Sequence, residues 1–293
     1  MTTAFRKAPR LVKKQILVGI DGSVVGGNAA DWAAARARDL GLQLNLLHAV
    51  PEPWAFREKT PHERATAQAK DLLKGEAARL AGLDPSLDVV TTLASGEPAE
   101  TMRRLSADAE MVVVGTDRRA DIHGEGFGSV SFQVAIISRC AVVVVPLSSI
   151  EAPSGVVVGI DGSSDSDIAV ESAAHEAQRM DQELVLVHAV GEAEGTPAHP
   201  GANSDGSLVL SAAAESLAGH YPGLVVQQIL AAQHGPAEAL LDASAGARLL
   251  VIGCKGRGGS RVLVGSVAQH VLLGIRCPTL ITRPALSAGQ ASS

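Results

Sequence analysis

The stretch VVVGIDGS, Val156–Ser163, decides the fold, because the chain has already used almost the same residues, ILVGIDGS, at Ile16–Ser23. A second pair follows in the same order, with LNLLHAV at 44–50 returning as LVLVHAV at 184–190, and both pairs are 140 residues apart. Later landmarks, MVVVG with LLVIG and then two GSV triplets, return after 138 and 137 residues. Shared order with slight drift predicts two copies of one domain, with small loop deletions in the second.

Each copy alternates apolar strands with helical segments. In the first copy, the strand ILVGI precedes a helix at 27–40, and LQLNLLHAV forms the second strand. Further strands are expected at LDVVTTLA, MVVVG and AVVVVP, with helices at 61–80, at 97–107 and in SVSFQVAIIS. Because neighbouring parallel strands need crossover helices, this order predicts an α/β fold of two tandem doubly wound, Rossmann-like domains, each a five-stranded parallel sheet flanked by helices.

The repeat also predicts the domain boundaries. We expect a first domain at 14–147, a linker at 148–153 and a second domain at 154–284. Flexible tails are expected at 1–13 and 285–293, and residues 191–206 are interpreted as a long polar loop.

Composition excludes several classes of protein. A chain of 293 residues that is 46% hydrophobic can bury two ordinary cores. The net charge is −6, with the acidic excess in the second half, so we expect no binding to nucleic acid. No apolar run approaches the roughly 20 residues of a membrane helix, and the basic N-terminal segment is not followed by a secretory signal. We therefore expect a cytoplasmic protein without membrane contact, whose 3 cysteines are free thiols.

Glycine-rich segments follow the first and fourth strands of each copy. Both lie at the carboxyl edge of a doubly wound sheet, where ligands bind beside the reversal of strand order. Glycines let backbone N–H groups point at an anion, and a helix that starts near Gly265 and Ser266 adds its N-terminal dipole. Phosphate suits that arrangement, and Asp161 offers an acceptor for a sugar hydroxyl. Alternatively, Asp21 and Asp161 only cap the helices that follow them, and the glycines form simple turns.

In these residues the chain resembles a tandem universal stress protein of the nucleotide-binding kind, from about Lys14 to Pro284. The family pattern is an aspartate at the end of a strand followed by G-x2-G-x9-G-[ST], and it implies binding of ATP or a related adenine nucleotide. A Mg²⁺ ion would be held mainly by phosphate oxygens and water, so no metal-binding side chain is expected. In the second repeat the resemblance implies a nucleotide site, with Ala189 at the adenine, formed by Asp161, Ala189, Gly253, Gly256, Gly265, Ser266 and Val267. In the first repeat it implies Asp21, Ala49, Gly115, Gly128, Ser129 and Val130.

Neither repeat matches the pattern fully. Eight residues separate Gly256 from Gly265, where the family has nine, and in the first repeat Arg118 stands in place of the second glycine. A side chain at a backbone position with positive φ costs about 1 kcal/mol. Arg118 can pair with phosphate directly, or it can fill the pocket and pair with a neighbouring aspartate. We therefore expect ATP at the second repeat, and both alternatives stay open for the first.

No catalytic residues are expected. His48 and His188 occupy matching strand ends, but no serine or cysteine nucleophile recurs beside them, so a structural role is expected. The phosphate-loop pattern GxxxxGK[ST] does not occur. The expected function is an ATP-binding regulatory module in stress adaptation that is not an enzyme. The alternatives are a scaffold that has lost nucleotide binding, a slow nucleotide hydrolase, and a binder of cyclic AMP or AMP.

The resemblance also bears on partners. Members of the family pair through their last strand, which implies that Ala141–Val145 pairs with Thr279–Thr282 within the chain. A homodimer of the two-domain chain and an unidentified protein partner are expected as well.

Overall fold

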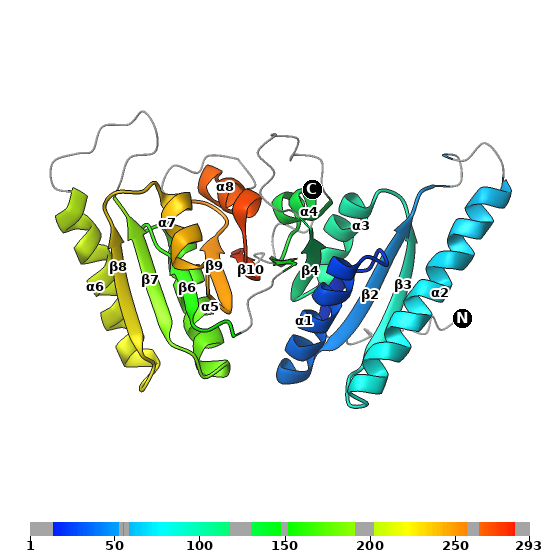
Figure 1. The fold of residues 1–293 in the computed structure, drawn as a ribbon, viewed down its shortest axis with the longest axis horizontal. Coiled ribbons are helices and arrows are strands. Elements are labelled where there is room, and N and C mark those ends of the chain that lie inside the picture. Colours follow the sequence, from blue (N-terminus) through cyan, green and yellow to red (C-terminus); the bar gives the residue numbers. More distant parts are fainter. Residues whose placement is uncertain are drawn as a thin grey trace, which may run out of the picture.

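The two copies form two α/β units joined through one continuous sheet (Figure 1). The structure is a computed structural model, and it describes residues 14–52, 55, 59–117, 130–147, 152–190, 202–256 and 264–284. The first domain comprises β1 (Gln15–Gly19), α1 (Val24–Leu40), β2 (Gln43–Val50), α2 (Lys59–Leu83), β3 (Val89–Ser95), α3 (Pro98–Leu105), β4 (Met111–Thr116), α4 (Val130–Ile137) and β5 (Ala141–Pro146). The second comprises β6 (Val156–Gly159), α5 (Ser164–Arg179), β7 (Leu184–Ala189), α6 (Ala202–His220), β8 (Val226–Ala231), α7 (Pro236–Ala243), β9 (Leu249–Gly253), α8 (Ser266–Gly274) and β10 (Thr279–Thr282).

The strand order confirms the predicted fold class. The sheet has the order β3-β2-β1-β4-β5-β10-β9-β6-β7-β8, so each domain contributes five strands. All pairs within a domain are parallel. In the first domain the chain moves outward from β1 through β2 to β3 and then returns to the other side of β1 with β4. The second domain does the same, with β7 and β8 on one side of β6 and β9 on the other. Each domain therefore has a reversal point, between β1 and β4 or between β6 and β9, at which a ligand crevice is expected.

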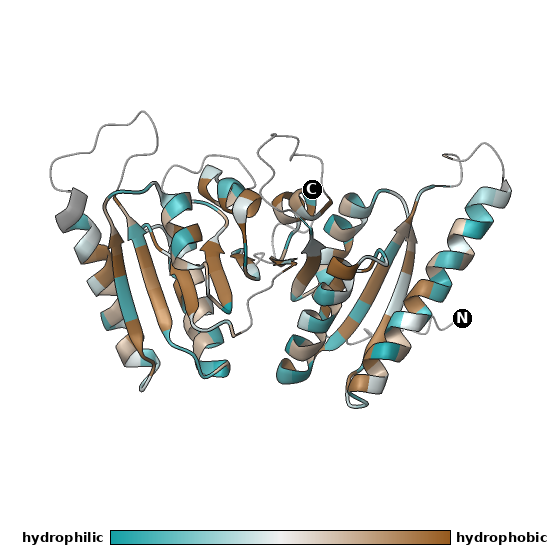
Figure 2. Cartoon of the chain, viewed as in Figure 1, coloured by the Kyte–Doolittle hydropathy of each residue, from teal (hydrophilic) through white to brown (hydrophobic). Residues whose placement is uncertain are grey.

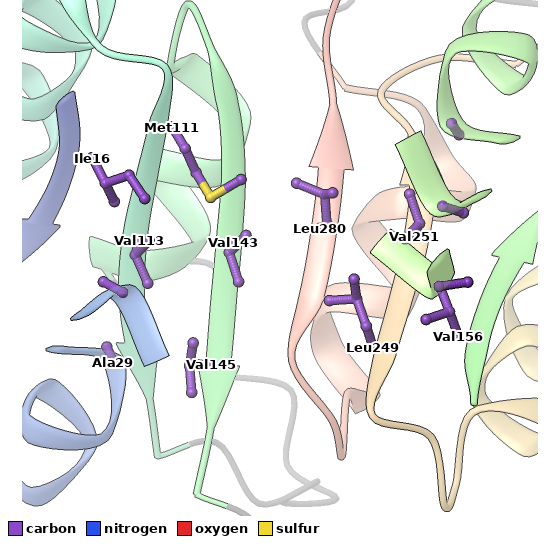
Figure 3. Close-up of a cluster of buried hydrophobic side chains, with 14 of the residues drawn as sticks. Ile16, Ala29, Met111, Val113, Val143, Val145, Val156, Leu249, Val251 and Leu280 are labelled. Atoms are coloured by element: carbon purple, nitrogen blue, oxygen red, sulfur yellow. The ribbon is translucent and has the colours of Figure 1, made fainter. Parts of the chain in front are cut away.

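The two domains meet through β5 and β10, which pair antiparallel in the middle of the sheet. Leu280 lies opposite Val143, and both side chains are buried. Val143 and Leu280 are equivalent positions of the two copies, because they are 137 residues apart and the nearby GSV triplets have the same spacing. A pseudo-twofold axis therefore passes between Val143 and Leu280, which lie on neighbouring strands in Figure 3.

Helices cover both faces of the sheet, as a doubly wound topology requires. One buried cluster unites the sheet with α1, α2, α5 and α6, and the other unites it with α3, α4, α7 and α8. The strands are coloured largely hydrophobic in Figure 2, whereas the helices carry hydrophilic residues along part of their surface. Alanines dominate the buried faces of α1 and α5, so these two helices approach the sheet closely.

Several element boundaries differ from the sequence predictions. The predicted polar loop at 191–206 is wrong for its last part, because α6 already begins at Ala202. Leu210 and Leu217 of this helix are buried against the sheet, and this tertiary packing outweighs the weak helix propensity of the polar residues at its start. Helix α1 begins at Val24 rather than at Gly27, because Ser23 provides its N-cap. Helix α2 spans Lys59–Leu83 and thus exceeds the predicted range at both ends.

The predicted tails at 1–13 and 285–293 and residues 148–151 of the predicted linker lie outside the described residues. Within the part of the chain that is described, no helix combines the length and apolar character that crossing a membrane would need.

Candidate functional site

A cavity of about 610 Å³ opens at the reversal point of the second domain. It lies at the carboxyl ends of β6, β7 and β9 and is bordered by residues at the N-terminal ends of α5, α7 and α8. This volume is within the range of about 300–1,000 Å³ that is usual for sites of small ligands and cofactors. The cavity therefore lies where the fold predicts a ligand and has the size for one.

Asp161 lies in a tight turn after β6 and lines the cavity. Its Oδ1 accepts a hydrogen bond from the backbone N–H of Ser163 over 2.9 Å, and Ser163 Oγ accepts one from the N–H of Ser166 over 3.2 Å. The first repeat has the same pair of interactions, with Asp21 before Ser23. The serines are thus the N-caps of α5 and α1, and the alternative that the aspartates cap these helices is wrong.

Gly253, at the end of β9, is required by the approach of α5. A Cβ atom at this position would lie 2.9 Å from the backbone oxygen of Asp165. Gly115 has the same role in the first domain, where a Cβ would lie 2.3 Å from the backbone oxygen of Val25. Because these positions have no Cβ atom, the first turn of each helix can lie directly against the end of the strand. This requirement comes from packing within the domain and does not involve a ligand.

Gly256 brings the glycine loop directly onto Asp161. A Cβ atom on Gly256 would lie 2.6 Å from Oδ2 of Asp161, which is closer than real Cβ contacts come. A larger residue at 256 would therefore push the loop away from the aspartate or turn the carboxylate aside. The spacing of these two residues is a property of the site that the sequence pattern only implied.

The N-terminus of α8 faces the same cavity. Gly265 is its N-cap residue, and its own N–H donates to the backbone oxygen of Cys254 over 2.7 Å, which closes the glycine loop. Glycine has no side chain with which to cap the helix, and the next residues, Ser266, Val267 and Ala268, all line the cavity. A helix N-terminus with N–H groups directed at a cavity favours an anion. Lys255, also in the lining, adds a positive charge.

Part of the lining is apolar. It is formed by Ile160, Val187, Leu240, Ile252 and Val264, with Ala189 at the end of β7. Such a wall suits the flat face of a heteroaromatic ring, while the polar groups fix its orientation. The lining thus combines groups that favour an anion with apolar side chains.

His188 lines the cavity, but its ring is tied to the backbone. Its Nδ1 lies 2.7 Å from the carbonyl oxygen of Ile160, and in the first domain His48 Nδ1 lies 2.6 Å from that of Ile20. Because a carbonyl only accepts, Nδ1 carries the proton in each contact. Each histidine thus joins the second strand of its domain to the turn after the first strand, which is a hydrogen-bonded arrangement of the kind expected for a structural histidine.

Cys254 is the thiol nearest to the predicted phosphate region, and it is not activated. Its Sγ donates to Asp165 Oδ2 over 3.0 Å. Burial, followed by this contact with a carboxylate, raises the pKa of Cys254 to about 11. Burial likewise raises the pKa of Cys140 to about 12 and that of Cys277 to about 11. All three are free thiols, as expected, and at neutral pH they are protonated and weakly nucleophilic.

All seven site residues predicted for the second repeat line this one cavity: Asp161, Ala189, Gly253, Gly256, Gly265, Ser266 and Val267. The structure adds residues that the sequence argument missed, notably Ser166 of α5 and Pro236 and Leu240 of α7. A signal for α7 was available in the repeat, because Pro-Ala-Glu at 98–100 returns at 236–238. In the structure Leu240 lies against Gly159, as its counterpart Met102 lies against Gly19 in the first domain.

The first repeat is described only in part. Asp21, Ala49, Gly115 and Val130 lie within the described residues, and Val130 begins α4 with its side chain exposed. Arg118, Gly128 and Ser129 lie outside the described residues.

Among the described residues, one group of side chains brings three ligand atoms within reach of a metal ion. It consists of His234, Glu238 and Asp242, all exposed. None of the three lines the cavity.

Comparison with known proteins supports the relationship that the repeat suggested. The family model described as "Universal stress protein family" matches residues 13–146 and 155–283. A universal stress protein of Mycobacterium tuberculosis H37Rv is 35% identical over 292 residues, which cover 92% of this chain and 96% of that protein. The crystal structure of a universal stress protein from Archaeoglobus fulgidus covers 92% of this chain and 96% of its own, with a TM-score of 0.71 and 17% identity. A structure described as that of the universal stress protein from Archaeoglobus fulgidus in complex with dAMP covers 46% of this chain and 99% of its own, with a TM-score of 0.37 and 23% identity.

Proposed function

Because the chain belongs to the universal stress protein family, with two domains of that family in tandem, we propose that it binds ATP in its second domain and acts as a regulatory module in stress adaptation. The observation that carries this proposal is the cavity at the reversal point between β6 and β9, which gathers the seven residues of the nucleotide pattern. The nucleotide state would change the contacts of the protein with a partner or with a second copy of itself.

The parts of the cavity suit the parts of a nucleotide. The N-terminus of α8, with Ser266 and Val267, and the side chain of Lys255 would hold phosphates, and Asp161 would accept from a ribose hydroxyl. The apolar wall with Ala189 would take the adenine. An affinity in the micromolar range corresponds to about 8 kcal/mol, which such a site can supply. A Mg²⁺ ion that accompanies ATP would be held mainly by phosphate oxygens and water.

We propose that the protein binds the nucleotide without turning it over. Among the described residues of the cavity lining, the titratable side chains are Asp161, His188, Lys255 and Cys254. His188 is held through Nδ1 by the carbonyl of Ile160, and the pKa of the Cys254 thiol is raised to about 11 by burial. Asp161 has the ribose as its proposed partner. Nε2 of His188 is the remaining base, and it belongs to the end of β7 beside Ala189, the proposed adenine contact, rather than to the N-terminus of α8, where a terminal phosphate would lie.

The first test identifies the ligand. Acid release from the purified full-length chain, followed by chromatography and mass spectrometry, would yield one or two ATP molecules per chain if the proposal is right. AMP or cyclic AMP would assign the smaller nucleotide to the same cavity. The proposal fails if nucleotide is absent and millimolar ATP with Mg²⁺ does not raise the melting temperature. That result would favour a scaffold that works through its surfaces.

The second test locates the site and asks about turnover. Asp161→Asn and Gly256→Val should each abolish the binding of ATP to the second domain, measured by titration calorimetry. Asp21→Asn is the matched control, because it makes the same change at the equivalent position of the first domain. It should leave the second site intact and reduce the stoichiometry only if both domains bind. Unchanged affinity in both second-domain variants would refute the assignment. Phosphate release that is lost in Asp161→Asn would show that the protein is a slow hydrolase.

The same proposal includes the assembly of the chain. The ladder between β5 and β10 supports the view that the two domains act as one pseudo-symmetric unit. A homodimer of this unit and a cytoplasmic location stay predictions, and sedimentation of the purified chain measures the first.

A further inference from the structure

A charged network lies on the pseudo-twofold axis between the two domains. It joins α1 of the first domain to α5 of the second through four side chains, Arg36, Asp39, Glu176 and Arg179. Arg36 forms an ion pair with Glu176, and Asp39 forms one with Arg179. Within α5, Arg179 Nη2 also contacts Glu176 Oε2 over 3.0 Å. We call these four residues the axis quartet.

Each cross-domain pair of the axis quartet joins equivalent positions of the repeat. Arg36 and Glu176 are 140 residues apart, and so are Asp39 and Arg179, which is the spacing of the repeat in this part of the chain. Equivalent positions can touch each other only at a twofold axis. The contacts therefore lie on the same axis as the pairing of Val143 with Leu280.

The two helices match in burial and differ in charge at these positions. Every buried residue of α1 has a buried counterpart in α5, from Gly26 with Ser166 to Ala37 with Ala177. Only one of these buried positions is charged, and it holds Arg36 in α1 and Glu176 in α5. The side chain is 8% exposed in Arg36 and 4% exposed in Glu176. One turn further along, aspartate in α1 corresponds to arginine in α5. The charges are thus exchanged between domains that otherwise bury the same face.

The buried pair has little value as a source of stability. Only one nitrogen of Arg36 is paired, since Nε and Nη1 are buried with no hydrogen-bond partner among the described residues. Burial is also the main cause of a lowered pKa of the Arg36 guanidinium. Removing two charges from water often costs as much as their attraction gains, so the burial of this pair is weak evidence that it stabilises the fold.

From this arrangement we infer that the axis quartet selects the partner of each domain: it admits the other domain of this chain and rejects a second copy of the same domain. If two first domains paired through β5, the axis would oppose Arg36 to Arg36 and Asp39 to Asp39. Two second domains would oppose Glu176 to Glu176 and Arg179 to Arg179. Like charges at a buried position are strongly unfavourable, so the pairing is heterotypic. Two chains could then share this surface only by pairing the first domain of one with the second domain of the other.

The test exchanges the charges in the full-length chain at constant net charge. One half-exchange variant carries Arg36→Glu with Asp39→Arg, so that both domains have the second-domain charges. The other carries Glu176→Arg with Arg179→Asp, so that both have the first-domain charges. The full-exchange variant carries all four substitutions and restores each opposite-charge contact within the axis quartet with its sign reversed; the exposed contact of Arg38 with Asp39 is lost wherever Asp39 is replaced.

The full-exchange variant distinguishes repulsion between α1 and α5 from destabilisation of either helix by the substitutions themselves. We expect each half exchange to lower the melting temperature by about 5–15 °C, and the full exchange to return to within about 3 °C of the wild type. Hydrogen exchange should rise in β5 and β10 in the half-exchange variants and return in the full exchange. As a control, Glu100→Arg with Arg103→Glu reverses an exposed ion pair within α3 and should change little.

Two results would overturn the inference. One is a half-exchange variant that melts within about 3 °C of the wild type, since the charges would then not oppose each other across the axis. The other is a full-exchange variant no more stable than the half exchanges, since the effect would then arise within each domain. If the half-exchange variants do not fold, the full exchange still decides, because it contains the same four substitutions.

Discussion

At the scale of single residues, the glycines of the site have separate physical causes. Gly253 makes room for the backbone of α5, and Gly256 makes room for the carboxylate of Asp161. Only the second of these close approaches involves a group that we assign to the nucleotide. The motif in the sequence does not distinguish between them, because both positions read simply as glycine.

This difference predicts that Gly253→Ala lowers the free energy of unfolding even without nucleotide. The added methyl group would lie 2.9 Å from a backbone oxygen that cannot turn aside, so we expect a loss of about 1–3 kcal/mol in urea denaturation. The control is Gly219→Ala in α6, where a Cβ meets nothing within 4 Å. That change should raise stability by about 0.5–1 kcal/mol, because alanine costs less entropy in a helix. Equal effects at the two positions would contradict the steric explanation.

At the scale of elements, the helices that follow the first strand of each domain start in the same way. Ser23 Oγ accepts from the N–H of Gly26 over 3.1 Å, and Ser163 Oγ accepts from that of Ser166 over 3.2 Å. In both turns the preceding aspartate accepts from the N–H of the serine. The repeated GIDGS motif therefore specifies a strand end, a turn and a helix start together.

We predict that Ser163→Ala lowers the free energy of unfolding by about 0.5–2 kcal/mol, because the first turn of α5 loses its cap. Ser163→Gly should lower it by only a few tenths of a kcal/mol. Glu97→Ala is the control, since Glu97 occupies the N-cap of α3 without a side-chain cap hydrogen bond. It should change the value by less than about 0.5 kcal/mol. A loss at Glu97 as large as that at Ser163 would show that the cap contact is not the cause.

At the scale of the whole molecule, the two domains share one sheet and a pseudo-twofold junction. Leu280 pairs with Val143 in this junction, and Arg283, just after β10, donates to the carbonyl oxygens of Ala135 and Ile136 at the end of α4 over 2.5 and 3.0 Å. An arginine at the C-terminal end of a helix is favourable for its dipole. The second domain thus stabilises an element of the first.

The junction predicts that the domains lose protection together. Leu280→Ala should lower the free energy of unfolding by about 2–5 kcal/mol. It should also raise hydrogen exchange in both domains, because the space left by the leucine side chain lies at the junction between them. Leu44→Ala, a matched change in buried β2 of the first domain, should raise exchange mainly there. Mass spectrometry of peptides from each domain separates the two outcomes. If Leu280→Ala affected only the second domain, the domains would be independent units.

The sequence by itself determined that there are two copies of one α/β domain, because strands and helices differ in periodicity and the motifs return at nearly constant distance. Because strand ends converge at one edge of a parallel sheet, it also placed Asp161 and the glycine segment before Ser266 at one site, and the resemblance to the family supplied the full set of seven residues. Only the tertiary structure decided that serine rather than aspartate caps α1 and α5, that Leu240 of α7 lines the cavity, and that Arg36 meets Glu176. These contacts join residues from separate elements, and the distances between such residues are set by packing and not by spacing along the chain.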